Sequence, residues 1–259
     1  MGTAQVQGEL GARAREWADL QEGMFAPFYV AAFDAADVAQ GTALLDVGCG
    51  AGLALTLADK RGAKVSGLDA ASALVAIAKS RLPGADIRVG EIEALPFADG
   101  AFDVVTGFNS FQYAADRVHA MAEAKRVART GGIVVAAVWG LPEKCQLGSY
   151  LAALGKLMPA PPPGAPGPWA LSQGGALEAL AEAAGLQPKR AASIAVALTF
   201  PDDETALRGL LAAGPAIRAI KHSGEAAVRT AVAEAIRGNR KPDGSYHFVN
   251  EFRFLVSRA

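Results

Sequence analysis

The sequence has few of the residues that cross-link a fold or bind a metal ion. Its 259 residues include two cysteines, Cys49 and Cys145, and three histidines, His119, His222 and His247. None of them stands in a CxxC or HExxH spacing, so neither a disulfide framework nor a metal site is expected. Histidines in such scattered positions are more often structural than catalytic. The sequence therefore assigns no catalytic residue.

An excess of positive charge is also missing. Lys and Arg total 25 against 26 Asp and Glu, which gives a formal net charge of −1. Because phosphate contacts supply much of the affinity for nucleic acids, this balance argues against a nucleic-acid partner. The longest apolar run, Ile133 to Trp139, is far too short to cross a membrane, and the first residues lack the layout of a signal peptide. We expect a cytoplasmic protein without a membrane partner, and its oligomeric state is left open.

Apolar runs and helical stretches alternate through the middle of the chain. Apolar residues make up 51% of the sequence, enough to fill a substantial core. Strands are expected at 42–47, 64–69, 86–89, 102–107 and 133–139, with helices at 53–61, 73–82 and 118–128. Because these strands are continuously apolar rather than alternating, both faces of their sheet should be covered by helices. This pattern predicts a doubly wound α/β fold.

Outside this repeat, helices are expected at 9–38, 143–158, 176–184 and 202–238, an extended proline-rich loop at 159–168, and two more strands at 193–200 and 248–256. We interpret the whole chain, 1–259, as a single domain, with the N-terminal helices and two insertions forming a cap over the substrate. Its parts are the N-terminal helices at 1–40, a cofactor-binding core at 41–140, and cap insertions at 143–170 and 202–238.

A glycine-rich loop directly follows the first predicted strand. Gly48, Gly50 and Gly52 there allow a sharp turn and bring backbone N–H groups close to a ligand. A dinucleotide fingerprint, GxGxxG, would require glycine at position 53, which is Leu53. Asp46 would repel a pyrophosphate but would suit a ligand that carries an ammonium and a sulfonium group.

Carboxylates also stand at the ends of the next two strands. Asp69 ends the second strand, where an acid can accept both hydroxyls of a ribose. Glu91 follows the third strand and can accept a hydrogen bond from an exocyclic amine while Ile92 packs against a purine. NAD enzymes share the acid at the second strand, so Asp69 alone does not discriminate between cofactors.

Taken in order, four motifs make the sequence resemble the class I S-adenosylmethionine-dependent methyltransferases. They are LLDVGCGAG, GLDA, GEIEALPFADGAFDVV and RTGGIVVAAVW, within 42–139. The resemblance points to the bacterial small-molecule subgroup, which includes quinone and natural-product methyltransferases. It implies an α/β fold with a Rossmann-like, seven-stranded, mostly parallel sheet whose last strand is antiparallel. It also implies methyl transfer to an O, N or C atom of a small metabolite.

The resemblance further implies that S-adenosylmethionine is held at the ends of the first four strands. The implied contacts are Asp46, Gly48, Cys49 and Gly50 with the methionine part, Asp69 with the ribose, Ala70, Glu91 and Ile92 with the adenine, and Asn109 with the amino-acid part. Cys49 is interpreted as a small buried residue rather than a nucleophile, because no base is placed beside it.

Aromatic residues mark the expected substrate pocket. Phe111, Tyr113 and Trp139 follow strands at the edge where open α/β sheets bind ligands, so we expect them to line it rather than the core. The motif Asn109–Tyr113 departs from the Asn-Pro-Pro-Tyr/Phe set of enzymes that methylate nucleobases or glutamine. Four N-terminal aromatics have two open interpretations, as a roof over the pocket or as the apolar face of a packed helix: Trp17, Phe25, Phe28 and Tyr29.

Two other functions compete with methyl transfer. An NAD-dependent oxidoreductase is disfavoured by Leu53, by Asp46 and by the lack of a Tyr-x-x-x-Lys pair. A methyltransferase-like protein could also bind the cofactor without using its methyl group, as a cyclase or a binding module, because a fold does not decide a function.

Overall fold

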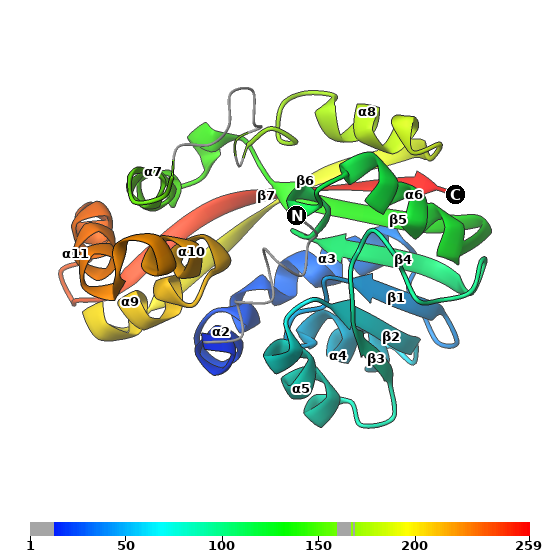
Figure 1. The fold of residues 1–259 in the computed structure, drawn as a ribbon, viewed down its shortest axis with the longest axis horizontal. Coiled ribbons are helices and arrows are strands. Elements are labelled where there is room, and N and C mark those ends of the chain that lie inside the picture. The colour runs from blue at the N-terminus through cyan, green and yellow to red at the C-terminus, as the bar shows by residue number, and fades with distance from the viewer. Residues whose placement is uncertain (1–12, 160–166, 168) are drawn as a thin grey trace.

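The computed structural model describes residues 13–159, 167 and 169–259, and a seven-stranded sheet forms its centre (Figure 1). The strand order is β3-β2-β1-β4-β5-β7-β6. Strands β1 to β5 run parallel, whereas β7 is antiparallel to both β5 and β6. The strands are β1 (Ala43–Val47), β2 (Lys64–Asp69), β3 (Asp86–Val89), β4 (Phe102–Phe108), β5 (Ala128–Trp139), β6 (Gln187–Phe200) and β7 (Tyr246–Arg258). The predicted α/β fold with an antiparallel last strand is confirmed.

Both faces of the sheet are buried. Adjacent residues of β1, Leu44 and Leu45, are fully buried and belong to hydrophobic clusters on opposite faces. One cluster includes residues of α3 (Ala26–Ala35), α4 (Leu53–Asp59) and α5 (Ser72–Arg81). The other includes residues of α6 (Arg117–Val127) and α8 (Ala176–Ala183). Helices on both faces explain why the strand sequences are apolar without alternation.

Strands β6 and β7 are longer than the sequence predicted, and they continue beyond the rest of the sheet. Their pairing runs from Gln187 opposite Arg258 to Phe200 opposite Tyr246. The pairing of β5 with β7 stops at Trp139 opposite Phe252, so the far halves of β6 and β7 project past β5. Figure 1 shows this projection reaching into a group of helices.

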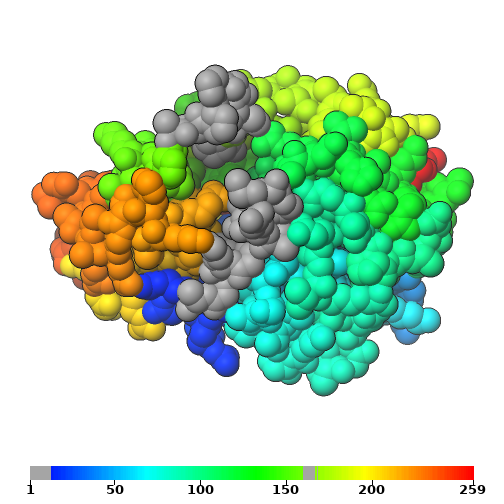
Figure 2. All heavy atoms as spheres, viewed as in Figure 1, coloured from blue at the N-terminus to red at the C-terminus, as the bar shows by residue number. Residues whose placement is uncertain are grey.

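Those helices form the cap, which we define as α7 (Gly148–Lys156), α9 (Asp203–Leu211), α10 (Gly214–Ser223) and α11 (Glu225–Ile236). Helix α11 packs against α7, α9 and α10. In the space-filling view the orange surface of the cap lies on one side of the molecule, and the cyan and teal surface of residues 60–100 lies on the other (Figure 2). The cap falls within the predicted insertions, although positions 160–166 and 168 lie outside the described residues.

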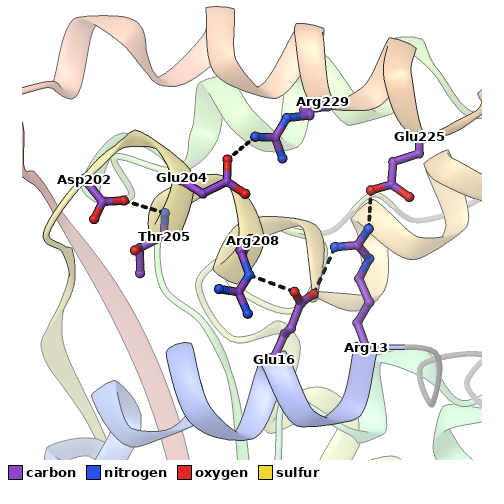
Figure 3. A network of polar contacts seen from close by, with 8 residues as sticks. All are labelled: Arg13, Glu16, Asp202, Glu204, Thr205, Arg208, Glu225 and Arg229. Carbon is purple, nitrogen blue, oxygen red and sulfur yellow. Dashed lines mark hydrogen bonds and ion pairs between the residues drawn. The ribbon is translucent and has the colours of Figure 1, made fainter.

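The first described helix, α2 (Ala14–Leu20), is tied to the cap by a network of ion pairs (Figure 3). Glu16 on α2 accepts from Arg208 of α9 at 3.0 Å and from Arg13 at 2.9 Å. Arg13 also pairs with Glu225 at the start of α11. Single exposed ion pairs add little stability, but this network joins three segments that are far apart in the sequence. None of the helices in the described ranges is long and apolar enough to cross a membrane.

Candidate functional site

A cavity of about 190 Å³ lies at the carboxyl ends of β1, β2 and β4. The chain leaves β1 toward β2 on one side and returns to β4 on the other, which creates the crevice where open α/β sheets bind ligands. The sheet forms one wall, and the N-terminal segment and the cap form the others. The residues that line the cavity include Trp17, Gln21, Phe25, Tyr29, Gly48, Gly50, Asp69, Ala70, Ile92, Phe108, Asn109, Ser110, Tyr113, Trp139, Tyr150, Pro215 and Arg218.

The glycine loop turns sharply at the edge of this cavity. Gly48 and Gly50 line it, and their φ angles are +80° and +55°. Residues with a side chain rarely adopt such positive φ angles. A Cβ atom on Gly48 would lie 2.5 Å from Cβ of Ser110, so the two loops approach too closely for any side chain there. The N–H of Gly48 donates to the carbonyl of Leu68 at 2.7 Å, which holds the loop against the end of β2.

Asp69 lies beneath the loop with its carboxylate buried. One oxygen accepts from the N–H of Gly50 at 2.9 Å, and the other accepts from the N–H of Ala71 at 2.8 Å. An ionised carboxylate offers about four acceptor positions, so each oxygen keeps one for a ligand. Burial raises the pKa of Asp69, and the two amides oppose that rise. The arrangement fixes the orientation of the carboxylate while leaving acceptor capacity toward the cavity.

Asp46 lies deeper than the cavity wall. It is 2% exposed, and its Oδ1 accepts from the hydroxyl of Thr106 at 2.7 Å. Its pKa is raised to about 7, chiefly by burial and also by the nearby carboxylates of Asp69 and Glu22, while the hydrogen bond from Thr106 opposes the rise. A group of buried carboxylates around one loop favours a positively charged ligand.

Cys49 is also placed behind the loop rather than in the cavity lining. Its side chain packs in the core against Gly67, and burial raises the pKa of its thiol well above the usual range. This placement agrees with its interpretation as a small buried residue.

The end of β4 presents polar atoms that lack partners. Asn109 Oδ1 and Ser110 Oγ are buried and have no hydrogen-bond partner among the described residues, and both residues line the cavity. Asn109 has a φ of +53°, a conformation that asparagine tolerates better than most residues, and its N–H donates to the carbonyl of Ala137 at 2.9 Å. Buried polar groups are nearly always paired, so a ligand that bonds to them is expected here.

The predicted adenine contacts lie near one another at the same edge. Ala70 and Ile92 line the cavity, and Ile92 is 2% exposed. Glu91 is adjacent to Ile92 but is not part of the lining. The structure therefore brings eight of the twelve predicted residues to one cavity, while Asp46, Cys49, Glu91 and Phe111 lie outside its lining.

The predicted substrate residues divide between the cavity and the core. Tyr113 and Trp139 line the cavity, and the ring of Trp139 lies 4.6 Å from that of Phe252. Phe111 is 1% exposed and belongs to the core, where its ring fills the space beside Gly107. A Cβ on Gly107 would lie 2.3 Å from the Phe111 ring. Phe111 therefore shapes the end of β4 from behind.

The N-terminal aromatics divide in the same way. Trp17, Phe25 and Tyr29 line the cavity, whereas Phe28 is fully buried in the core. The ring centroids of Tyr29 and Phe108 lie 4.6 Å apart, and Trp17 stacks on Phe25 with 5.9 Å between the ring centroids. The N-terminal helices, residues 14–35, thus provide both a wall of the cavity and side chains that pack in the core.

A buried ion pair that the sequence did not reveal joins the N-terminal segment to the glycine loop. Glu22 is 3% exposed, and it accepts from Arg81 and from the N–H of Leu53 at 3.1 Å. Arg81 also donates to the carbonyl of Ala51 at 2.8 Å. Burial raises the pKa of Glu22, and Arg81 opposes that rise. These contacts fix the N-terminal segment over the loop, although no local motif indicates them.

The lining offers few proton acceptors. All three histidines are exposed and lie outside it. Burial raises the pKa of Tyr29 and of Tyr150 above the usual phenol range, and the Tyr150 hydroxyl donates to the carbonyl of Leu210 at 2.8 Å. Both phenols therefore stay protonated near neutral pH. Among the described residues no group of three or more His, Cys, Asp or Glu is placed to hold a metal ion.

Comparison with known proteins extends these observations. A family model described as a methyltransferase domain matches residues 45–136, from β1 to β5. A malonyl-[acyl-carrier protein] O-methyltransferase of Serratia marcescens is 35% identical over 95 residues, which is 37% of this chain and 37% of that protein. A demethylmenaquinone methyltransferase of Renibacterium salmoninarum is 34% identical over 109 residues, 42% of this chain and 46% of that protein. The chain thus spans less than half the length of these curated relatives.

A likeness to solved structures extends over more of the chain. The crystal structure of the [4+2]-cyclase SpnF has a TM-score of 0.58 and 20% sequence identity, and the match covers 90% of this chain and 80% of that one. At this level of identity the likeness shows a shared fold.

Proposed function

We propose that this protein transfers a methyl group from S-adenosylmethionine to a small molecule. In support, residues 45–136 match the methyltransferase domain model, and one relative is named as a probable S-adenosylmethionine-dependent methyltransferase. One observation carries the proposal. The loop that matches the family, the carboxylate of Asp69 and the unpaired polar atoms of Asn109 and Ser110 all meet at one cavity.

The residues at this cavity fit the cofactor. Asp69 keeps acceptor positions for two ribose hydroxyls, and Ile92 offers an apolar contact for the adenine. Asn109 Oδ1 is a buried acceptor without a donor, which an ammonium group would satisfy. The buried carboxylate of Asp46 favours a ligand with net positive charge.

The cofactor supplies a methyl group bound to a positively charged sulfur. The chain's own part is to hold donor and acceptor in line and to exclude water. Tyr29, Phe108 and Trp139 provide apolar walls for this purpose. The acceptor is an O, N or C atom of a small metabolite. In support, one relative is named an O-methyltransferase and another is named for demethylmenaquinone.

Calorimetric titration of the purified chain with S-adenosylmethionine, S-adenosylhomocysteine and NAD in parallel tests the proposal. We expect micromolar binding of the first two and none of NAD. Release of S-adenosylhomocysteine in the presence of an acceptor then shows methyl transfer. Binding of NAD alone would contradict the proposal in favour of a dehydrogenase. Cofactor binding without transfer to any acceptor would favour the cyclase or binding-module alternative.

The buried carboxylate of Asp46 predicts a pH dependence of cofactor binding. Its pKa of about 7 leaves a large neutral fraction at pH 6, and a cationic ligand prefers the ionised form. Affinity for S-adenosylmethionine should therefore rise roughly 5- to 10-fold between pH 6 and pH 7.5. S-adenosylhomocysteine lacks the charge on sulfur and should show a weaker dependence.

Two variants check that Asp46 is the responsible group. Asp46→Asn should flatten the calorimetric pH profile. Thr106→Val removes the hydroxyl that lowers the pKa of Asp46, so it should move the midpoint to higher pH. A wild-type affinity that does not change over this range would show that Asp46 does not sense the cofactor's charge.

A further inference from the structure

We propose that the substrate carries an oxyanion, a carboxylate or a phosphate, which Arg218 binds at the cap side of the cavity. This inference rests on the proposed function and names the substrate class of the same site. Arg218 lies on α10 and lines the cavity, and the first turn of that helix, Gly214 and Pro215, lines it as well.

Among the described residues that line the cavity, Arg218 is the only basic side chain and Asp69 is the only acidic one. The two belong to opposite walls, because Asp69 ends β2 in the sheet and Arg218 projects from the cap. Asp69 is already bonded to the amides of Gly50 and Ala71. The cavity therefore has an acidic cofactor end and a basic cap end.

The guanidinium of Arg218 has no hydrogen bond or ion pair with any described residue. Its neighbour is the ring of Tyr113, whose centroid lies 5.8 Å from Arg218 Cζ. Arg81, which lies beside the glycine loop, differs in that its guanidinium is bonded to Glu22 and to the backbone carbonyl of Ala51. An arginine held over an aromatic face keeps its planar array of donors available for a ligand.

The surroundings of Arg218 are apolar. Leu151 and Leu198 line the same cavity, as does Tyr150, which is 3% exposed and whose hydroxyl is already bonded to Leu210. A partly buried cation without a counter-charge is unfavourable, and an oxyanion that binds both guanidinium nitrogens would remove that cost. Apolar walls beside one cation fit a hydrocarbon body that carries one anionic group.

A rival role for Arg218 is to hold the carboxylate of the cofactor. The position of Arg218 on the cap, stacked over the predicted substrate residue Tyr113, favours the substrate role. The two roles differ in a measurable way, because only the rival role makes cofactor affinity depend on Arg218.

Tryptophan fluorescence offers a direct readout, since Trp17 and Trp139 both line the cavity. The probes are straight hydrocarbon chains of six to twelve carbons that end in a carboxylate, a phosphate or an alcohol, each titrated in the presence of saturating S-adenosylhomocysteine. We expect the best anionic probe to bind at least about 10-fold more tightly than the alcohol of the same length. The carboxylate and phosphate arms show which oxyanion is preferred.

Variants locate the effect. Arg218→Met should abolish the preference for anions, and Arg218→Lys should keep a reduced one, because lysine offers a point charge without the planar donors. Arg237→Met is the matched control, since Arg237 is exposed at the end of α11 and lies outside the cavity lining, and it should leave the preference unchanged.

Two results would overturn the inference: no anionic probe binding more tightly than its alcohol, or Arg218→Met weakening S-adenosylhomocysteine as much as it weakens the anions. The titration with S-adenosylhomocysteine, made first on each sample, separates this inference from the proposed function. If the wild type does not bind S-adenosylhomocysteine, the proposed function fails. If the wild type binds S-adenosylhomocysteine but binds the anionic probes no more tightly than the alcohols, only the inference fails.

Discussion

Replacing Asp69 with alanine is expected to weaken binding of S-adenosylmethionine by at least about 100-fold. Each hydrogen bond from a ribose hydroxyl to this carboxylate is worth about 1.5–3 kcal/mol, because the acceptor is charged and buried. The variant also removes the acceptor that fixes the N–H groups of Gly50 and Ala71, so the loop loses its support. Calorimetric titration of both proteins measures the change.

The matched control for this change is Asp86→Ala. Asp86 begins β3, at the opposite edge of the sheet from Asp69, and it pairs with Arg88 on the surface. This control should bind the cofactor as the wild type does. An Asp69→Ala protein that melts normally and binds with wild-type affinity would show that the ribose lies elsewhere.

Gly48→Ala is expected to lower the free energy of unfolding by about 2–6 kcal/mol and to abolish measurable cofactor binding. The φ of +80° strains any residue with a Cβ, and the new Cβ would lie 2.5 Å from Cβ of Ser110. Backbone strain of this kind costs about 1–3 kcal/mol, and overpacking adds a similar amount. Urea unfolding measures the first effect and calorimetry the second.

A second substitution separates the two causes. Ser110→Gly removes the atom that Gly48→Ala would meet, so the double variant should recover the steric part of the loss and keep the backbone part. Gly23→Ala serves as the control, because nothing lies within 4 Å of its Cβ position and its φ is not positive. If the double variant is no more stable than Gly48→Ala alone, the contact with Ser110 is not the cause.

The part of the site that belongs to the sheet could be predicted from the sequence. Asp69, Ala70 and Asn109 were expected at strand ends, and the structure places all three at one cavity. The reason is geometric, since parallel strands bring their carboxyl ends to the same edge. Buried strands are also recognisable by their continuous apolar residues, which explains why five strands of the sheet could be located from the sequence.

The part that comes from distant segments could not be predicted. Arg218 reaches the cavity only because β6 and β7 carry the cap over the sheet edge, and Glu22 meets Arg81 across separate helices. No local pattern encodes such contacts. The sequence also could not separate Phe111 from Tyr113, because both lie in one short 3₁₀ turn. The ring of Phe111 packs in the core, whereas the ring of Tyr113 lines the cavity.

The paired ends of β6 and β7 make helices α9, α10 and α11 of the cap a single replaceable insertion. Phe200 and Tyr246 are partners in the ladder, so the segment 201–245 leaves and re-enters the sheet at one point. Its excision in favour of a tight hairpin turn would leave the strand pairing intact, and a different helical segment could be inserted there without changing the register. Substrate choice could thus diverge among related chains by exchange of this one segment, while the loop and Asp69 on the sheet keep the same cofactor.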